Sequence, residues 1–158
     1  MPEAILPIVL IIFLIIFKVS RKRYEFALSA RIAMAVMLVS TGIAHFVYTK
    51  GMALMLPGWV PYREEMVYIS GVLEVLMAVA LLIPNIQKIT GWLVILFFIV
   101  ILPVNINAAV KHVNMDTGDY TGSGTEYLLY RIPLQLFFIG WVYFSCIRFP
   151  AGVKSGME

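Results

Sequence analysis

The chain has 158 residues, of which 61% are hydrophobic and 13% charged, with a net charge of +3. The charged fraction is about half of that in soluble domains, and the mean hydropathy is +0.92. These values exclude a disordered chain, a coiled coil and a water-soluble enzyme with a polar surface. The single cysteine, Cys146, excludes an internal disulfide and a multi-cysteine metal site. The composition indicates an integral membrane protein of one domain, residues 1–158, that contacts membrane lipid and binds no nucleic acid.

Five apolar stretches approach the length of about 20 residues that a helix needs to cross a bilayer. Irregular backbone cannot face hydrocarbon, so each stretch is expected to be a helix. They cover residues 4–17, 27–48, 66–84, 89–110 and 127–147. The sequence therefore predicts one all-α transmembrane bundle with five spans.

The charged residues predict how this bundle is oriented. A basic cluster at residues 18–23 follows the first stretch, whereas acidic residues gather at 64–65 and 116–126. Basic residues are retained on the cytoplasmic side of a membrane. We expect the N-terminus outside, the C-terminus in the cytoplasm, and a location in a bacterial inner (plasma) membrane.

The segment 50–65 is apolar but too short to span a bilayer, and its prolines are expected to break any helix. Trp59 is a side chain suited to the headgroup level. Two interpretations stay open for this interfacial or re-entrant segment. It is either a loop that rests on the bilayer or a lid, formed by Pro57, Trp59 and Pro61, over the outer mouth of the bundle.

A small set of polar side chains lies inside the predicted spans. Charged or strongly polar residues deep in a span cost roughly 2.5–3.5 kcal/mol on insertion and are tolerated only where they are paired or functional. Their positions along four helices place them in one layer in the outer half of the membrane, and the opposite half is expected to be almost entirely apolar. We call this set the polar layer: His45, Glu74, Asn105, Asn107, Arg131 and Gln135.

A stripe of small residues accompanies the acidic member of the polar layer. Ser70, Glu74 and Ala78 share one helix face and Gly71 lies beside them. Small residues allow two transmembrane helices to approach closely. The stripe therefore predicts close packing of the 66–84 helix against a neighbour, with Glu74 turned inward.

The residue types of the polar layer suit the binding of an amphipathic molecule. Glu74 and Arg131 are expected to form an ion pair. His45 is expected to share or relay the proton of the Glu74 carboxyl group. Asn105 and Gln135 would orient a carbonyl or hydroxyl group, as in a quinone, within a polar cavity open to the outer side. The alternative is a buried ion pair that only fixes the helix register.

Five short motifs resemble the DoxX-like (DoxX/DoxD) small integral membrane proteins, in order between residues 32 and 147. They are Gly42-Ile-Ala-His45-Phe46, the loop Pro57-x-x-x-Pro61, Tyr68-Ile-Ser-Gly71-Val-Leu-Glu74, Pro103-Val-Asn105-Ile-Asn107 and Arg131-Ile-Pro-Leu-Gln135. The resemblance implies a four-helix bundle, with the first helix as an extra element. Family members include subunits of a thiosulfate:quinone oxidoreductase. The resemblance therefore implies a subunit that binds a quinone or another lipophilic molecule within an oxidoreductase complex.

The resemblance also implies partners, namely other membrane protein subunits or further copies of the chain. No metal and no intrinsic cofactor are expected, with a quinone as the candidate ligand. Two further functions stay open. One is an accessory or assembly subunit without catalysis, and the other is an isomerase of a lipid substrate that uses Glu74 and His45. Whether the chain is an enzyme stays open as well.

Overall fold

The apolar stretches of the sequence are helices in the computed structural model, which describes residues 4–21 and 26–149. Within these residues no strand forms, and the only β contact is an isolated bridge between Asn114 and Asp119. The all-α fold class is confirmed for this part of the chain. Its helices are α1 (Ile5–Arg21), α2 (Phe26–Val47), α3 (Thr49–Met55), α4 (Arg63–Leu81), α5 (Gln87–Val110) and α6 (Glu126–Val142), which continues as the π-helical segment η2 (Tyr143–Arg148).

Three of the described helices are long and apolar enough to cross a membrane: α2, α5, and α6 together with η2. The first helix, α1, is also apolar but shorter. Helix α4 has 19 residues but is not one of these three, and it carries the acidic side chains Glu64, Glu65 and Glu74. The lengths and composition of these helices are those of a membrane protein.

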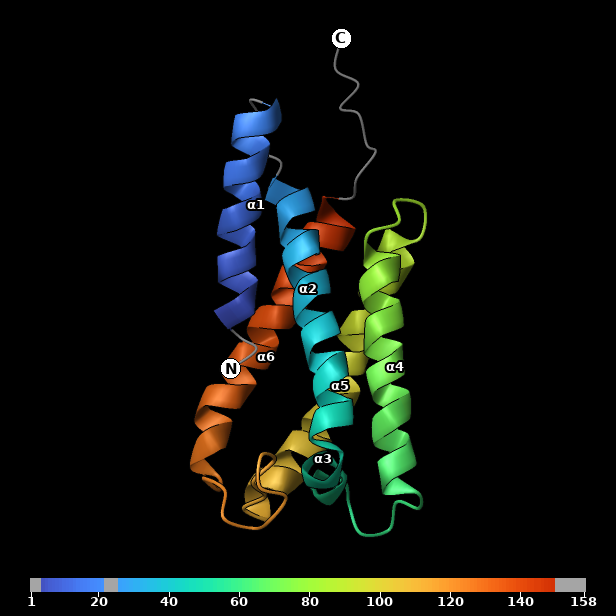
Figure 1. Ribbon diagram of the computed structural model, residues 1–158, viewed down its shortest axis with the longest axis vertical. Coiled ribbons are helices and arrows are strands. Elements are labelled where there is room, and N and C mark those ends of the chain that lie inside the picture. Colours follow the sequence, from blue (N-terminus) through green and yellow to red (C-terminus); the bar gives the residue numbers. More distant parts are fainter. Residues whose placement is uncertain (1–3, 22–25, 150–158) are drawn as a thin grey trace.

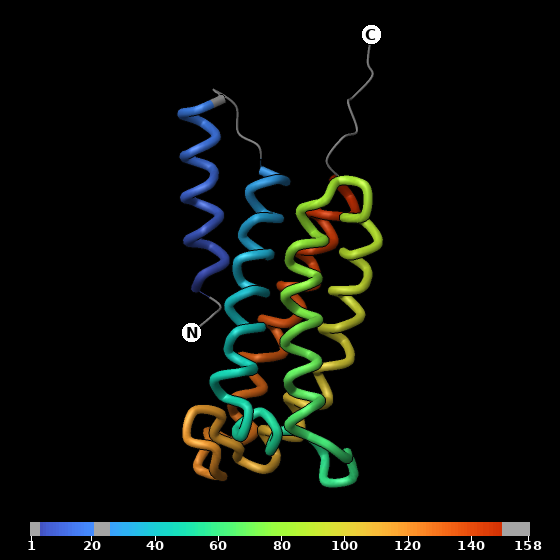
Figure 2. Tube along the Cα trace, turned by 45° about the vertical axis from the view of Figure 1, so that its right-hand side comes forward, coloured from blue at the N-terminus to red at the C-terminus, as the bar shows by residue number. Residues whose placement is uncertain are grey.

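The helices α2, α4, α5 and α6 run alternately up and down (Figure 1). α2 packs most extensively against α4, and α5 packs against α6 and η2. α1 lies beside α2, away from α3 (Figures 1 and 2). We refer to the end of the bundle where α2 meets α3 as the α3 end, and to the end where α2 begins as the opposite end.

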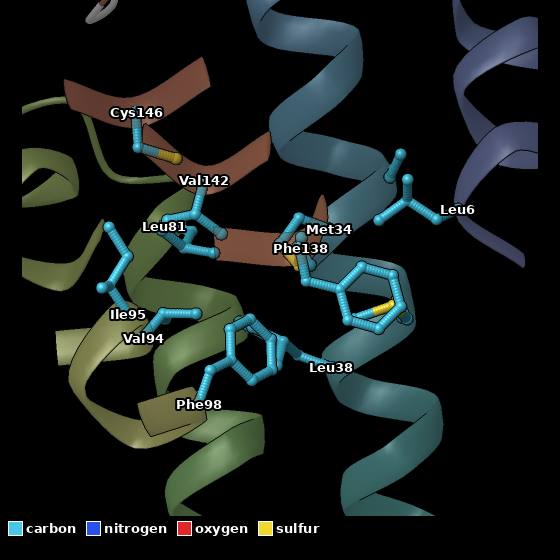
Figure 3. Close-up of a cluster of buried hydrophobic side chains, with 14 residues drawn as sticks. Leu6, Met34, Leu38, Leu81, Val94, Ile95, Phe98, Phe138, Val142 and Cys146 are labelled. Atoms are coloured by element: carbon cyan, nitrogen blue, oxygen red, sulfur yellow. The ribbon is translucent and has the colours of Figure 1, made fainter. Parts of the chain in front are cut away.

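An apolar core fills the middle of the bundle (Figure 3). Met34 and Leu38 of α2 meet Val94 of α5 and Val142 of α6, and all four side chains are completely buried. α1 joins this core through Leu6, which is also completely buried. The core therefore separates the polar side chains at the two ends of the bundle.

The segment 50–65 differs from its prediction in the first half. Residues Thr49–Met55 form the helix α3, and the Thr49 hydroxyl donates a hydrogen bond to the carbonyl of His45 (2.7 Å). The expectation that prolines break any helix here is wrong for these residues, because Pro57 disfavours helix only at the residue before it and beyond. After α3 the chain runs irregularly to α4, and Trp59 is 83% exposed there.

Candidate functional site

The polar layer is built on a close crossing of α2 and α4. A Cβ atom on Gly42 would lie 2.8 Å from the Val75 side chain and 2.9 Å from the carbonyl oxygen of Gly71. A Cβ atom on Gly71 would lie 2.8 Å from the Cβ of His45. Only residues without side chains fit there, as expected for small residues between membrane helices. The crossing places Glu74, one turn after Gly71, next to α2.

His45 and Glu74 form the centre of the polar layer. The Nδ1 atom of His45 lies 3.5 Å from Oε2 of Glu74 and 2.8 Å from the carbonyl oxygen of Thr41. Because a carbonyl oxygen only accepts hydrogen bonds, Nδ1 carries the proton and donates it to Thr41. His45 is 7% exposed and Glu74 4% exposed. The imidazole and the carboxyl group are therefore held together inside the bundle.

The expected direct ion pair between Glu74 and Arg131 does not form. Among the described residues, the charge contact of Glu74 within 4.0 Å is with His45, and Arg131 acts on the carboxyl group from a greater distance. The reason is the order of the helices around the bundle. α4 packs against α2 and α5, and α6 packs against the same two helices, so α4 and α6 lie diagonally.

Two buried polar atoms of the layer lack a hydrogen-bond partner within the described part of the chain. They are Oε2 of Glu74, an acceptor when ionised, and Nε of Arg131, a donor. An unpartnered buried group of this kind costs about 1–3 kcal/mol or more when charged. The layer thus contains one unused acceptor and one unused donor on two helices.

Asn105 and Gln135 connect α5 and α6 on the same level. The Nδ2 atom of Asn105 donates to Oε1 of Gln135 at 3.4 Å, and Nε2 of Gln135 donates to the carbonyl of Phe98. The next carbonyl, that of Ile99, has no helical donor because Pro103 lacks an N–H group. Asn105 and Gln135 are buried, and their amides bind each other instead of standing free.

Asn107 stands apart from the rest of the layer. Its Nδ2 atom donates to the carbonyl of Met55, the last residue of α3, at 2.5 Å. This bond ties the end of α5 to the end of α3. The structure therefore gives Asn107 a part in packing at the α3 end, while His45, Glu74, Arg131 and the Asn105–Gln135 pair face the interior.

Two surface hollows lie at the α3 end, with volumes of about 400 and 350 Å³. Both are lined by Lys50, Glu64 and Gly118, and no member of the polar layer lines either of them. The predicted lid residues, Pro57, Trp59 and Pro61, do not line them either. A lid function for these three residues stays a prediction.

A second buried polar cluster at the opposite end was missed from the sequence. Arg31 is 3% exposed and donates to Oε1 of Gln87, which is 2% exposed. The Ser145 hydroxyl lies 3.4 Å from the sulfur of Cys146, and the charge of Arg31 acts on that thiol. We call these four residues the Arg31 cluster. The expectation that this half is almost entirely apolar is wrong, because Arg31 folds into the bundle instead of reaching the membrane surface.

Within the described residues, no group of three or more histidine, cysteine, aspartate or glutamate side chains could hold a metal ion. His45 and Glu74 are one pair, and His112 lies in the loop after α5, close to Gly122. The chemistry that the polar layer offers is hydrogen bonding and proton exchange between an imidazole and a carboxyl group.

A comparison with protein families found a match, whereas two other comparisons found none. No curated protein and no solved structure matches the chain. A family described as Domain of unknown function (DUF8561) matches residues 34–146. The matched region begins in α2, ends in η2 and contains every residue of the polar layer, but it leaves out α1. Because this match covers more than half of the 158 residues, the chain belongs to the family Domain of unknown function (DUF8561).

Proposed function

We propose that α1, α2, α4, α5 and α6 are five membrane spans, with the N-terminus outside and the C-terminus in the cytoplasm of an inner (plasma) membrane of bacterial type. The distribution of charge between the two ends of the bundle supports this orientation. Helix directions place Lys18, Lys88 and Arg148 at the opposite end, and the acidic residues of 64–65 and 116–126 at the α3 end. By the positive-inside rule, the α3 end then faces outward.

We further propose that the polar layer binds the polar head of a quinone or of a similar lipophilic molecule. The observation that carries this proposal is the pair of unpartnered buried atoms, Glu74 Oε2 and Arg131 Nε. A ligand carbonyl would accept from Arg131, and a ligand hydroxyl would donate to Glu74. A quinol can do both at once, because the oxygen of one hydroxyl can accept from Arg131 while the opposite hydroxyl donates to Glu74; in a quinone, a carbonyl can accept from Arg131. Binding would give both buried atoms a hydrogen-bond partner and so remove the free-energy cost of leaving them unpartnered.

His45 gives this site a route for protons. Its Nδ1–H group points at the Thr41 carbonyl, and the Glu74 carboxyl lies beside it. When a quinone is reduced, a proton would pass from the Glu74 carboxyl to a carbonyl oxygen of the ring, which becomes a hydroxyl, with the imidazole as neighbour. The sequence contains one cysteine and two histidines, so we propose that a partner subunit supplies the electrons. The DoxX-like motifs contain His45, Glu74 and Arg131, and they support a role in such a complex.

Native mass spectrometry of the mildly solubilised protein tests the site. We expect a small lipophilic molecule on the wild-type protein and on Glu126→Gln, an exposed carboxyl outside the polar layer. We expect it to be lost from Glu74→Gln, and its mass would identify its chemical class. Added quinone should raise the melting temperature of the wild type but not of Glu74→Gln.

The alternatives give different results in the same experiment. Absence of a lipophilic molecule from all three proteins, with no effect of quinone on melting, would contradict the proposal. A stable complex with other membrane subunits that survives Glu74→Gln would instead favour an accessory or assembly role. Turnover of a lipid by the isolated wild type, abolished by His45→Ala in a folded protein, would favour the isomerase.

A further inference from the structure

The two hollows at the α3 end form one groove of mixed character. Their linings share Lys50, Glu64 and Gly118, so the two spaces adjoin. One lies between α3 and the start of α4, and the other extends to the end of α2. We call the combined space the interfacial groove. It lies apart from the polar layer, whose residues do not line it.

One side of the interfacial groove is apolar and opens onto the outside of the bundle. The rings of Phe46 on α2 and Tyr68 on α4 are stacked, with centroids 5.5 Å apart and an interplanar angle of 27°. Both rings line the groove and are 50% and 40% exposed. If α2 and α4 are membrane spans, this aromatic pair faces the acyl chains just below the headgroups.

The other side of the groove carries charges of both signs. Lys50 and Glu64 line both hollows and are exposed, yet within the described residues no ion pair joins them. Arg63 adds a second positive charge, whose guanidinium is held by the carbonyls of Gly58 (2.8 Å) and Val60 (3.4 Å). Glu65 lines the hollow beside α3 and Asp116 lines the hollow that reaches α2, so the groove carries three carboxylates in all. The groove thus offers separate positive and negative groups to one ligand.

We propose that the interfacial groove binds a phospholipid with a phosphoethanolamine headgroup. The phosphate would lie against Lys50, because basic side chains near a membrane surface attract phosphate. The primary ammonium would donate charge-assisted hydrogen bonds to the carboxylates of Glu64 and Asp116. The first acyl carbons would follow the Phe46–Tyr68 pair. A purely anionic headgroup would meet the three carboxylates of the groove, and a choline headgroup has no N–H group to donate to them.

This inference rests on the proposed placement of α2 and α4 in a bilayer, but not on the proposed ligand of the polar layer. The test is native mass spectrometry of the protein released from lipid nanodiscs. The discs contain equal amounts of phosphatidylethanolamine, phosphatidylglycerol and phosphatidylcholine with the same acyl chains. We expect the wild type to retain phosphatidylethanolamine in preference to the other two lipids.

The variants Lys50→Gln and Glu64→Gln should each lower the bound phosphatidylethanolamine about fivefold, the factor expected for one charge contact at a membrane surface. The controls Lys111→Gln and Glu126→Gln change charges at the same end but outside the groove, and should leave binding unchanged. An unchanged melting temperature would show that the two groove variants remain folded.

Three results would overturn the proposal. Equal retention of phosphatidylcholine would show that the carboxylates do not recognise an ammonium N–H group. Preference for phosphatidylglycerol, lowered by Lys50→Gln but not by Glu64→Gln, would show simple attraction of anionic lipid. Binding unaffected by both groove variants would place the lipid elsewhere. Glu74→Gln separates the two sites, because it should remove the lipophilic ligand of the polar layer and leave phosphatidylethanolamine bound.

Discussion

Gly42 of α2 and Gly71 of α4 approach so closely that a Cβ atom added to either would lie 2.9 Å from the carbonyl oxygen of the other. This contact fixes the distance between the two helices. His45 lies three residues after Gly42, and Glu74 three residues after Gly71, so one crossing of small residues brings the imidazole and the carboxyl group together. The packing of the bundle and the geometry of the polar layer therefore have the same cause.

Gly42→Ala is expected to lower the free energy of unfolding by about 1–3 kcal/mol, the usual cost of overpacking a tight interior. The added methyl group would meet the Val75 side chain and backbone of α4 at once, so no single rotamer change relieves it. Gly140→Ala is the matched control. A Cβ atom there has no neighbour within 4 Å, and alanine favours helix over glycine by up to about 1 kcal/mol. Thermal unfolding in detergent micelles measures both, and equal melting temperatures for the two variants would contradict the close crossing.

The hydrogen bond of His45 predicts its tautomer. The neutral imidazole should carry its proton on Nδ1, because Thr41 offers only a carbonyl oxygen at 2.8 Å. ¹⁵N NMR of the histidine rings distinguishes the two nitrogens directly. His112 serves as the reference, since its ring is exposed and its contact with Gly122 is longer, 3.4 Å. A His45 ring protonated only on Nε2 would contradict the geometry of the polar layer.

Helical spacing predicts the inward face of α4, because Ser70, Glu74 and Ala78 share one side of the helix and a lone acidic residue in an apolar span has few other places to go. The structure buries His45, Glu74, Asn105 and Gln135. Spacing does not encode the order of helices around a bundle. For that reason the partner of Glu74 was predicted on α6, whereas the diagonal arrangement of α4 and α6 gives this place to His45.

The Arg31 cluster could not be predicted for a related reason. A basic residue near the end of a span usually extends toward the membrane surface, so the sequence of α2 gave no sign that Arg31 turns inward. Its acceptor, Gln87, is 56 residues away in the chain. Such a cluster is indicated by an arginine inside a predicted span together with an amide residue at the same level of another helix.

Arg31→Met is expected to destabilise the protein by about 1.5–3 kcal/mol, the value typical of a hydrogen bond to a charged group. The Gln87 oxygen would lose this donor inside the bundle. Lys88→Met is the control, because Lys88 is the next residue along α5 but is exposed. Unfolding titrations in mixed micelles measure the difference between the two variants. A loss no larger for Arg31→Met than for Lys88→Met would show that the buried bond contributes little.

Cys146 is expected to resist modification in the folded protein. Cys146 is completely buried, and a Cβ atom added to Gly91 would lie 3.0 Å from the Cβ atom of Cys146. A maleimide should therefore label the wild type only after denaturation, since buried structural thiols are inert. Ser123→Cys, in the exposed part of the loop after α5, should take up one label under native conditions. Rapid native labelling of the wild type would contradict the packing of η2 against α5.

The loop between α5 and α6 is expected to weaken at acid pH through Asp119. Hydrogen bonds from Thr121 and Thr117 hold the pKa of Asp119 below its usual value. The Thr121 hydroxyl lies 2.5 Å and the Thr121 nitrogen 3.0 Å from Oδ1 of Asp119. A pKa lower in the folded loop than in the unfolded chain stabilises the loop above the unfolded pKa of about 3.9. This contribution is lost as the pH falls through the lower, folded pKa.

A carboxyl ¹³C NMR titration measures the pKa of Asp119 in the wild type and in Thr121→Val. We expect Thr121→Val to raise this pKa toward its usual value, because the hydroxyl and its hydrogen bond are removed. The protection factor for hydrogen exchange at the residue 121 amide should fall at low pH in the wild type and fall less steeply in the variant. Thr125→Val, four residues further along, is the control and should change neither quantity. A titration of Asp119 unaffected by Thr121→Val would show that the hydroxyl does not stabilise the carboxylate.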